Sequence, residues 1–217
     1  MNLIIGRIIA FSIAIPATLG LFGFKKSERS FLPFLWLIWI SLLNELISFI
    51  VIRTGHSNAV NYNAFTLAEG LLITWQFNKW KLFERLQLLY KGVLFVFVAT
   101  WITEMLFISS VTAFLSYFII LRSLVIVLIS INALNRLIVK EQSNLLKDSV
   151  FLICIGFVFS FTYAMLVEIF LMYGINESEA FMSNVYIISN YIGLFANVLF
   201  TLAILWMPRR QVFIRPA

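Results

Sequence analysis

The chain has 217 residues, of which 62% are hydrophobic and 12% are charged, and its formal net charge is +6. Soluble domains are about 45–50% apolar, so this composition excludes an ordinary soluble protein and favours a membrane protein. With one cysteine and one histidine, an internal disulfide and a His/Cys metal cluster are excluded, and we predict neither a metal nor another cofactor.

Apolar segments long enough to cross a bilayer follow one another along the chain, over 3–24, 31–52, 58–77, 91–108, 113–135, 149–173 and 181–207. The first could be mistaken for a signal peptide, but its basic cluster, Lys25, Lys26 and Arg29, follows the apolar run, which suits a retained helix. Because the segments and short loops use every residue, we predict a single domain over 1–217. The expected fold class is an all-α membrane protein, a bundle of seven transmembrane helices.

The basic residues indicate the orientation of this bundle. Of the 16 lysines and arginines, 13 fall at one set of segment ends: Lys25, Lys26, Arg29, Lys79, Lys81, Arg85, Lys91, Arg136, Lys140, Lys147, Arg209, Arg210 and Arg215. Cytoplasmic loops carry such an excess, so we predict an outside N-terminus and a cytoplasmic C-terminus. The expected location is the cell membrane, which is the inner membrane in a Gram-negative cell. The positive charge therefore indicates membrane orientation and not nucleic-acid binding.

Charged residues also lie inside the predicted spans. Glu69 is about 12 residues into the third span, or some 18 Å deep, near the middle of the bilayer. Tyr62, Thr66, Glu69 and Gln76 recur at helical spacing, so one face of this span is polar. Further charges and polar groups in other spans are Asn44, Glu45, Glu104, Arg122 and Glu168.

These charges are expected in one layer, between the middle of the bilayer and its outer surface. Charged groups in hydrocarbon pair with one another or line a water-filled cavity, so we predict an outward-facing polar pocket with Arg122 as its central cation. Arg7 is a further cation that could join this pocket. The excess of acids over arginines predicts that at least one carboxyl is protonated at neutral pH. The alternative is that these residues only lock the helices together.

The last span carries a polar stripe at steps of three and four residues, comprising Ser183, Tyr186, Asn190, Gly193, Asn197 and Thr201. It fits either a solute track or ordinary hydrogen bonding between helices. The full set of candidate ligand-binding or ion-coupling residues is Glu69, Arg122, Glu45, Glu168, Glu104, Asn44, Thr66, Tyr62, Asn190 and Asn197.

Two matched spacings suggest an internal repeat. Asn61 follows Glu45 by 16 residues across one outer loop, and Asn184 follows Glu168 by 16 residues across another. The first three and last three spans would then form parallel repeats joined by the fourth, a 3+1+3 design that transporters use. Coincidence is the alternative explanation.

Several protein classes are excluded. The last span has no lysine for a retinal Schiff base, the chain lacks the Pro-Gln pair of parallel-repeat sugar transporters, and one histidine cannot form a three-histidine zinc site. Without a nucleophile elbow or a phosphate loop, we predict no catalytic residues and do not expect an enzyme. The sequence favours transport of a small solute; the alternative is a membrane sensor or receptor. Expected partners are the lipid bilayer, a small polar ligand, and a cytoplasmic signalling partner or a second copy of the chain, with no nucleic acid.

Overall fold

The computed structural model describes residues 9, 11–109, 113–140, 144–173 and 178–209. Within these ranges the fold is all-helical, as predicted, and the only strand pairing is an isolated bridge between Ser27 and Arg209. The α-helices are α2 (Ala14–Gly23), α3 (Leu32–Arg53), α4 (Ala59–Lys79), α5 (Gln87–Thr103), α6 (Ser116–Lys140), α7 (Ser149–Met172) and α8 (Glu179–Leu205). Short 3-10 turns are η1 (Phe11–Ile13), η2 (Arg29–Phe31) and η4 (Leu145–Lys147), and a π-helical turn, η3 (Glu104–Ile108), continues α5.

Five helices in the described ranges are long and apolar enough to cross a membrane: α3 with η2, α5 with η3, α6, α7 and α8. This is the architecture of a polytopic membrane protein. The apolar run Phe11–Gly23 is shorter than a span, and most of the remainder of the predicted first span lies outside the described residues. Helix α4 is long enough but carries Asn61, Asn63, Glu69 and Gln76. The seven-span topology and the parallel repeat therefore remain predictions.

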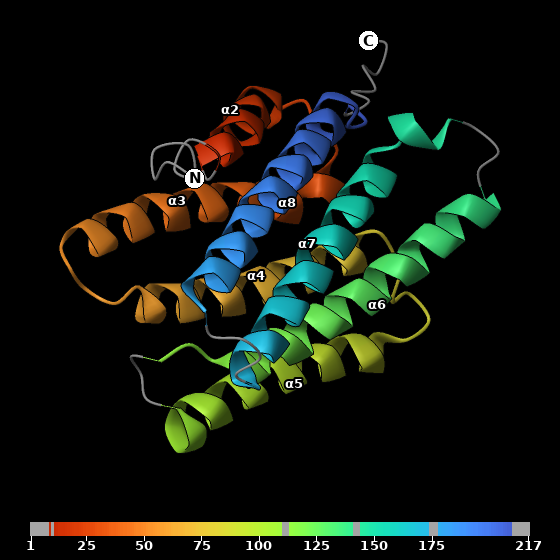
Figure 1. Cartoon of the computed structure of the whole chain (residues 1–217). Helices are drawn as coiled ribbons and strands as arrows, with labels where there is room; N and C mark the ends of the chain where they lie inside the picture. The colour runs from red at the N-terminus through yellow and green to blue at the C-terminus, as the bar shows by residue number, and fades with distance from the viewer. Residues whose placement is uncertain (1–8, 10, 110–112, 141–143, 174–177, 210–217) are drawn as a thin grey trace, which may run out of the picture.

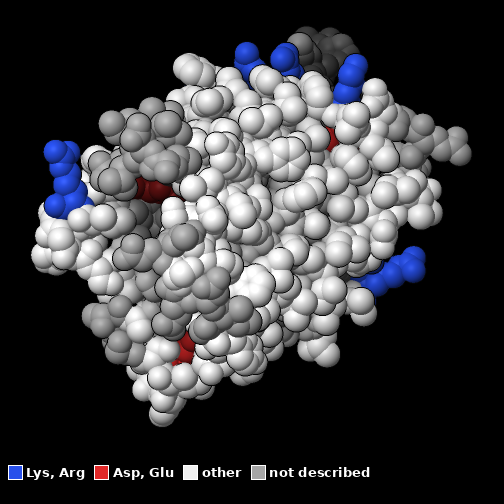
Figure 2. All heavy atoms as spheres, viewed as in Figure 1, with Lys and Arg blue, Asp and Glu red and all other residues white. Residues whose placement is uncertain are grey.

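The helices lie side by side in one bundle (Figure 1), and their contacts close into a ring. Each of them packs against the next in sequence, α2 packs against α8, and α4 also contacts α6 inside the ring. Large apolar side chains face outward along the bundle, among them Leu46, Phe95, Leu128, Phe159 and Val198. Figure 2 shows a largely uncharged face with the visible Lys and Arg side chains at its margins. Such a surface matches a lipid environment.

One end of the bundle collects the C-terminal ends of α4, α6 and α8 and the N-terminal ends of α3, α5 and α7. It is called the basic end here because Lys79, Arg136, Lys147 and Arg209 lie there. Polar contacts tie its elements together: the Glu28 N–H donates to the Pro208 carbonyl over 3.0 Å, which links the α2–α3 loop to the end of α8.

Gln76 holds the start of α3 against the end of α4. The backbone N–H of Phe34 donates to Gln76 Oε1 over 2.7 Å, and Gln76 Nε2 donates to the Ser30 carbonyl over 2.6 Å. The first N–H groups of a helix have no partner within the helix, and an unpaired one is costly in a membrane. Gln76 therefore belongs to the helix junction at the basic end.

Within the described residues the predicted span boundaries lie within three residues of the helix ends except at the end of α6, which runs to Lys140 although the predicted span ends at residue 135, and at the start of α5. This helix begins at Gln87, although the apolar segment predicted there begins at residue 91. The loop before it turns at Lys81, which has a φ of 60°, and buries Leu82 and Phe83 in the end of the bundle. Hydropathy marks where a helix becomes apolar, whereas backbone hydrogen bonding sets where it starts, and α5 begins in a polar stretch.

Candidate binding site

The predicted pairing of Arg122 with an acid inside the bundle is confirmed, and the partner is Glu69. Arg122 comes from α6 and is 2% exposed, and its Nη1 donates both to Glu69 Oε2 and, over 3.0 Å, to the Thr66 carbonyl of α4. The guanidinium lies 5.2 Å from the centre of the Phe161 ring of α7, a cation–π contact. Arg122 Nε has no hydrogen-bond partner among the described residues.

Gly70 allows this close approach of α6 to α4. A Cβ atom at Gly70 would lie 3.2 Å from both Arg122 Cδ and Phe97 Cδ2, which is tighter than ordinary packing. Thr66, Glu69 and Gly70 are three and four residues apart, so they share one face of α4. The aliphatic part of Arg122 therefore lies against the α4 backbone, and its charge meets Thr66 and Glu69.

The ion pair borders a cavity of about 190 Å³. Its polar lining comprises Ser41, Tyr62, Glu69, Arg122 and Ser160, and its apolar lining comprises Ile13, Leu37, Ile38, Phe65, Phe157, Phe161, Ala164 and Phe200. A water molecule occupies about 30 Å³ in the liquid, so the cavity has room for several waters or one small solute. We call it the ion-pair cavity.

Four phenylalanines close the ion-pair cavity on the side of the basic end. Phe34, Phe77, Phe157 and Phe200 come from α3, α4, α7 and α8, and their rings meet edge to face with centroids 5.4 to 6.3 Å apart. Phe157 and Phe200 line the ion-pair cavity, whereas Phe77 lines a separate cavity at the basic end. This aromatic layer therefore separates the two spaces.

Gly156 of α7 allows the aromatic layer to pack tightly. A Cβ atom at this position would lie 2.5 Å from Phe200 Cε1, a separation that real side chains do not reach. Phe200 therefore rests directly against the α7 backbone.

Glu104 and Glu168 lie at the start of α6 and form no ion pair with Arg122. The buried Glu104 carboxylate, on η3, accepts from the backbone N–H groups of Tyr117 over 3.0 Å and Phe118 over 2.6 Å. Glu168 of α7 lies within hydrogen-bonding reach of Ser116. Carboxylates are favourable at a helix N-terminus, where unpaired N–H groups carry partial positive charge. Of the four acids expected in the same layer as Arg122, only Glu69 forms an ion pair with it.

Other predicted residues connect helices. Asn44 Oδ1 accepts from Asn61 Nδ2 over 2.8 Å, which joins α3 to α4, and Asn197 Nδ2 donates to Ser12 Oγ over 2.8 Å, which joins α8 to η1. The Glu45 side chain has no hydrogen bond or ion pair to another described residue. Asn190 is half-buried and does not line the ion-pair cavity. Arg7, the further predicted cation, lies outside the described residues.

The structural role of Asn63 was not predicted from the sequence. Its Nδ2 donates to the Ala113 carbonyl over 2.8 Å, its Oδ1 accepts from the Leu115 N–H over 3.2 Å, and its carbonyl accepts from Trp101 Nε1 over 2.9 Å. Asn63 thus fixes the entry of α6 beside α4. The only signal was its place in the polar start of α4. Ser160 and Phe161, which line the cavity, lie in an apolar segment that offers no comparable signal.

Comparisons of the chain with protein-family models, with curated proteins and with solved structures found no match. The function of the site is therefore inferred from its own residues and contacts.

Proposed function

We propose that this protein transports a small polar or ionic solute across the cell membrane and that the solute binds at the Glu69–Arg122 pair. One observation carries the proposal: the ion pair borders a cavity instead of being sealed by apolar side chains. Charges inside a membrane protein are expensive and mark solute or ion pathways. An ion pair that served only to join α4 to α6 would need no space beside it.

The chemistry of the pair suits exchange with a solute. Arg122 Nε is a donor without a partner among the described residues, and Ser41, Tyr62 and Ser160 add hydroxyl groups to the same cavity. An anionic group of the solute would replace Glu69 at Arg122. The released Glu69 carboxylate would then bind a proton or a cationic group of the same solute.

The two cavities support a transport pathway. In the orientation that the basic residues predict, the basic end faces the cytoplasm and the ion-pair cavity lies on the outer side of the aromatic layer. Carriers alternate access to a central site by moving groups of helices against one another. Phe34, Phe77, Phe157 and Phe200 come from different helices, so such a motion would separate their rings and join the cavities.

The test uses proteoliposomes on a solid-supported membrane, challenged in turn with amino acids, organic acids and organic amines. The wild-type chain should give a solute-dependent current, and Glu69→Gln should abolish it because glutamine cannot exchange charge. Glu104→Gln is the matched comparison: the same substitution at a carboxylate that caps a helix should lower thermal stability and leave the current.

The Glu69→Gln variant leaves the Arg122 charge without its partner, so a loss of current must be distinguished from a loss of stability. The double variant Glu69→Gln/Arg122→Gln removes both charges and keeps two amides that can hydrogen-bond. It should unfold near the wild-type temperature and still give no current. A full current with an unchanged pH profile in Glu69→Gln would refute the proposal. A solute that raises the unfolding temperature of the wild type without any current would favour a receptor.

A further inference from the structure

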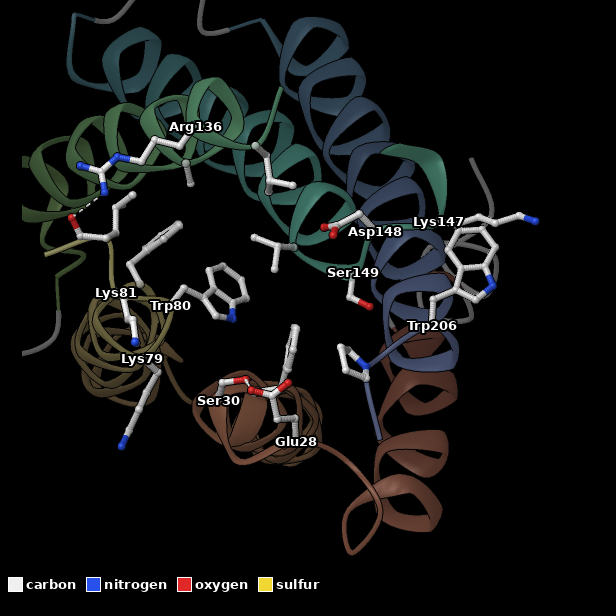
Figure 3. Close-up of a pocket in the computed structure, with 17 residues that line it drawn as sticks. Glu28, Ser30, Lys79, Trp80, Lys81, Arg136, Lys147, Asp148, Ser149 and Trp206 are labelled. Carbon is white, nitrogen blue, oxygen red and sulfur yellow. Dashed lines mark hydrogen bonds between the residues drawn. The ribbon is translucent and has the colours of Figure 1, made fainter. Parts of the chain in front are cut away.

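A second and larger cavity, of about 660 Å³, opens at the basic end (Figure 3). It lies between the start of α3, the ends of α4, α6 and α8, and the start of α7. No described residue lines both this space, which we call the basic-end cavity, and the ion-pair cavity. The residues that line the basic-end cavity indicate a ligand of their own, independently of the proposed transport.

Two hydrogen-bonding groups in its wall have no partner among the described residues: Trp80 Nε1 and Ser149 Oγ. Ser149 is only 3% exposed, and in Figure 3 the Trp80 indole nitrogen faces the open middle of the cavity, whereas Ser149 lies in the opposite wall. An unsatisfied buried polar group costs about 1–3 kcal/mol, so each needs an explanation. The indole N–H is solely a donor, and the ligand group that satisfies it must be an acceptor.

The charges around the cavity favour an anion. Its lining includes four cations, Lys79, Lys81, Arg136 and Lys147, and two acids, Glu28 and Asp148. In Figure 3 the Lys79 and Lys147 side chains extend outward from the rim, so their charges surround the opening without entering the cavity.

Both acids are already engaged. The Ser30 hydroxyl donates to Glu28 Oε1 over 2.7 Å, and the Phe151 N–H donates to Asp148 Oδ1 over 2.8 Å. These hydrogen bonds leave both carboxylates charged, and Lys81 also pairs with Glu84, so the lining has a modest excess of positive charge, which concentrates anions at the opening.

We propose that the basic-end cavity binds an anion through carboxylate or phosphate oxygens that accept hydrogen bonds from Trp80 Nε1 and Ser149 Oγ. The start of α7 contributes Ser149 and Val150 to the lining, beside the Asp148 carboxylate that caps this helix. Phe31, Phe77 and Leu137 provide apolar walls for the remainder of the ligand. The oxygens belong either to a soluble anion or to the headgroup of an anionic lipid.

The test places a reporter thiol in the cavity without touching either donor. Cys154 is buried and is the only cysteine of the sequence, so Cys154→Ala provides a cysteine-free background and Val150→Cys adds a thiol to the cavity wall. The thiol is modified with an anionic methanethiosulfonate, a sulfonate, and with a cationic one, a quaternary ammonium. Both rates are normalised to those of a free thiol.

The anionic reagent should react faster by about tenfold after normalisation, because the cations focus negative charge into the cavity. Asn144→Cys in the same background is the control, since this exposed residue at the same end does not line the cavity. At Asn144→Cys the preference for the anionic reagent should be smaller. Equal normalised rates at the two positions would contradict a cavity built for anions.

Protection from modification identifies the ligand. Inorganic phosphate or succinate, added in lipid-free detergent, should slow modification of Val150→Cys if the ligand is soluble. Protection in nanodiscs that contain phosphatidylglycerol, but not in phosphatidylcholine alone, would assign the site to an anionic headgroup. No protection by either source would overturn the proposal.

Two variants test the donors in that background. Trp80→Phe keeps an aromatic ring without the N–H, and Ser149→Ala removes the hydroxyl, so each should abolish protection. Protection that persisted in both would overturn the assignment of these donors. Calorimetric titration of the unmodified chain and of Trp80→Phe with phosphate and with phosphatidylglycerol micelles gives the same comparison if the cysteine variants do not fold. Heat of binding in neither titration of the unmodified chain would also overturn the proposal.

Discussion

Glu69 and Glu104 are the same kind of residue in similar surroundings, yet the structure uses them differently. Both belong to helices that we predict to cross the membrane; Glu104 is buried and the Glu69 side chain is 17% exposed. Glu69 faces the Arg122 guanidinium at the edge of a cavity, whereas Glu104 faces two backbone N–H groups at the first turn of α6. The comparison teaches that the role of an acid inside a membrane bundle depends on what its oxygens meet and on whether space remains beside them.

The largest expected effect tests the Glu69 side of this comparison. Arg122→Leu removes the partner cation and the hydrogen bond to the Thr66 carbonyl. Breaking a buried pair by removing one partner costs about 3–5 kcal/mol, so the variant should unfold at a clearly lower temperature. The buried Cys154 thiol, which becomes reactive to a fluorogenic dye on unfolding, reports the transition.

Neutralising Glu69, which Arg122→Leu leaves unpaired, should restore part of the lost stability. Glu69→Gln in the Arg122→Leu background removes the unpaired charge, and its unfolding temperature should lie between those of Arg122→Leu and the wild type. An Arg122→Leu variant as stable as the wild type would show that the ion pair does not hold α4 and α6 together.

A smaller effect is expected at the Glu104 side. Glu104→Ala leaves the Tyr117 and Phe118 N–H groups without their acceptor, at a cost of about 1–3 kcal/mol. Glu104→Gln retains one acceptor oxygen and should lose less. Dye labelling of Cys154 measures the unfolding temperatures of both variants. The solute-dependent current should persist in the protein that remains folded. Loss of current without loss of stability would move Glu104 from helix capping to solute binding.

The smallest effect concerns the space that the ion pair needs. Gly70→Ala would press a methyl group against Arg122 and Phe97, and overpacking costs about 1–3 kcal/mol. Alanine is better than glycine in a helix by about 0.5–1 kcal/mol, so the net loss should be small.

Gly92→Ala is the matched control for Gly70→Ala, because a Cβ at Gly92 in α5 would meet nothing within 4 Å. This variant should be as stable as the wild type or slightly more so. Gly70→Ala should also weaken the response to the transported solute, since Arg122 must move. Identical unfolding temperatures and solute responses in the two variants would show that the contact of Arg122 with Gly70 is unimportant.

The sequence by itself determined the helices and the need for a charge partner. Continuous apolar runs such as 149–173 leave their backbone groups no choice but helical hydrogen bonding in a membrane, and α7 forms there. Arg122, surrounded by apolar residues in its own segment, required an acid from another helix because an unpaired guanidinium at that depth is too costly. The basic residues also cluster at alternate loops, and alternate loops of a membrane bundle lie on one side, so their charge predicts the basic end.

Only the tertiary structure decided which acid pairs with Arg122 and where space remains. Glu45, Glu69, Glu104 and Glu168 look alike in the sequence, and the choice among them depends on how each helix is rotated and on Gly70 admitting Arg122. The basic-end cavity depends likewise on residues that the chain brings together from α3, α4, α6, α7 and α8. Hydropathy and spacing describe each helix separately, whereas a cavity is made by the side chains that neighbouring helices do not fill.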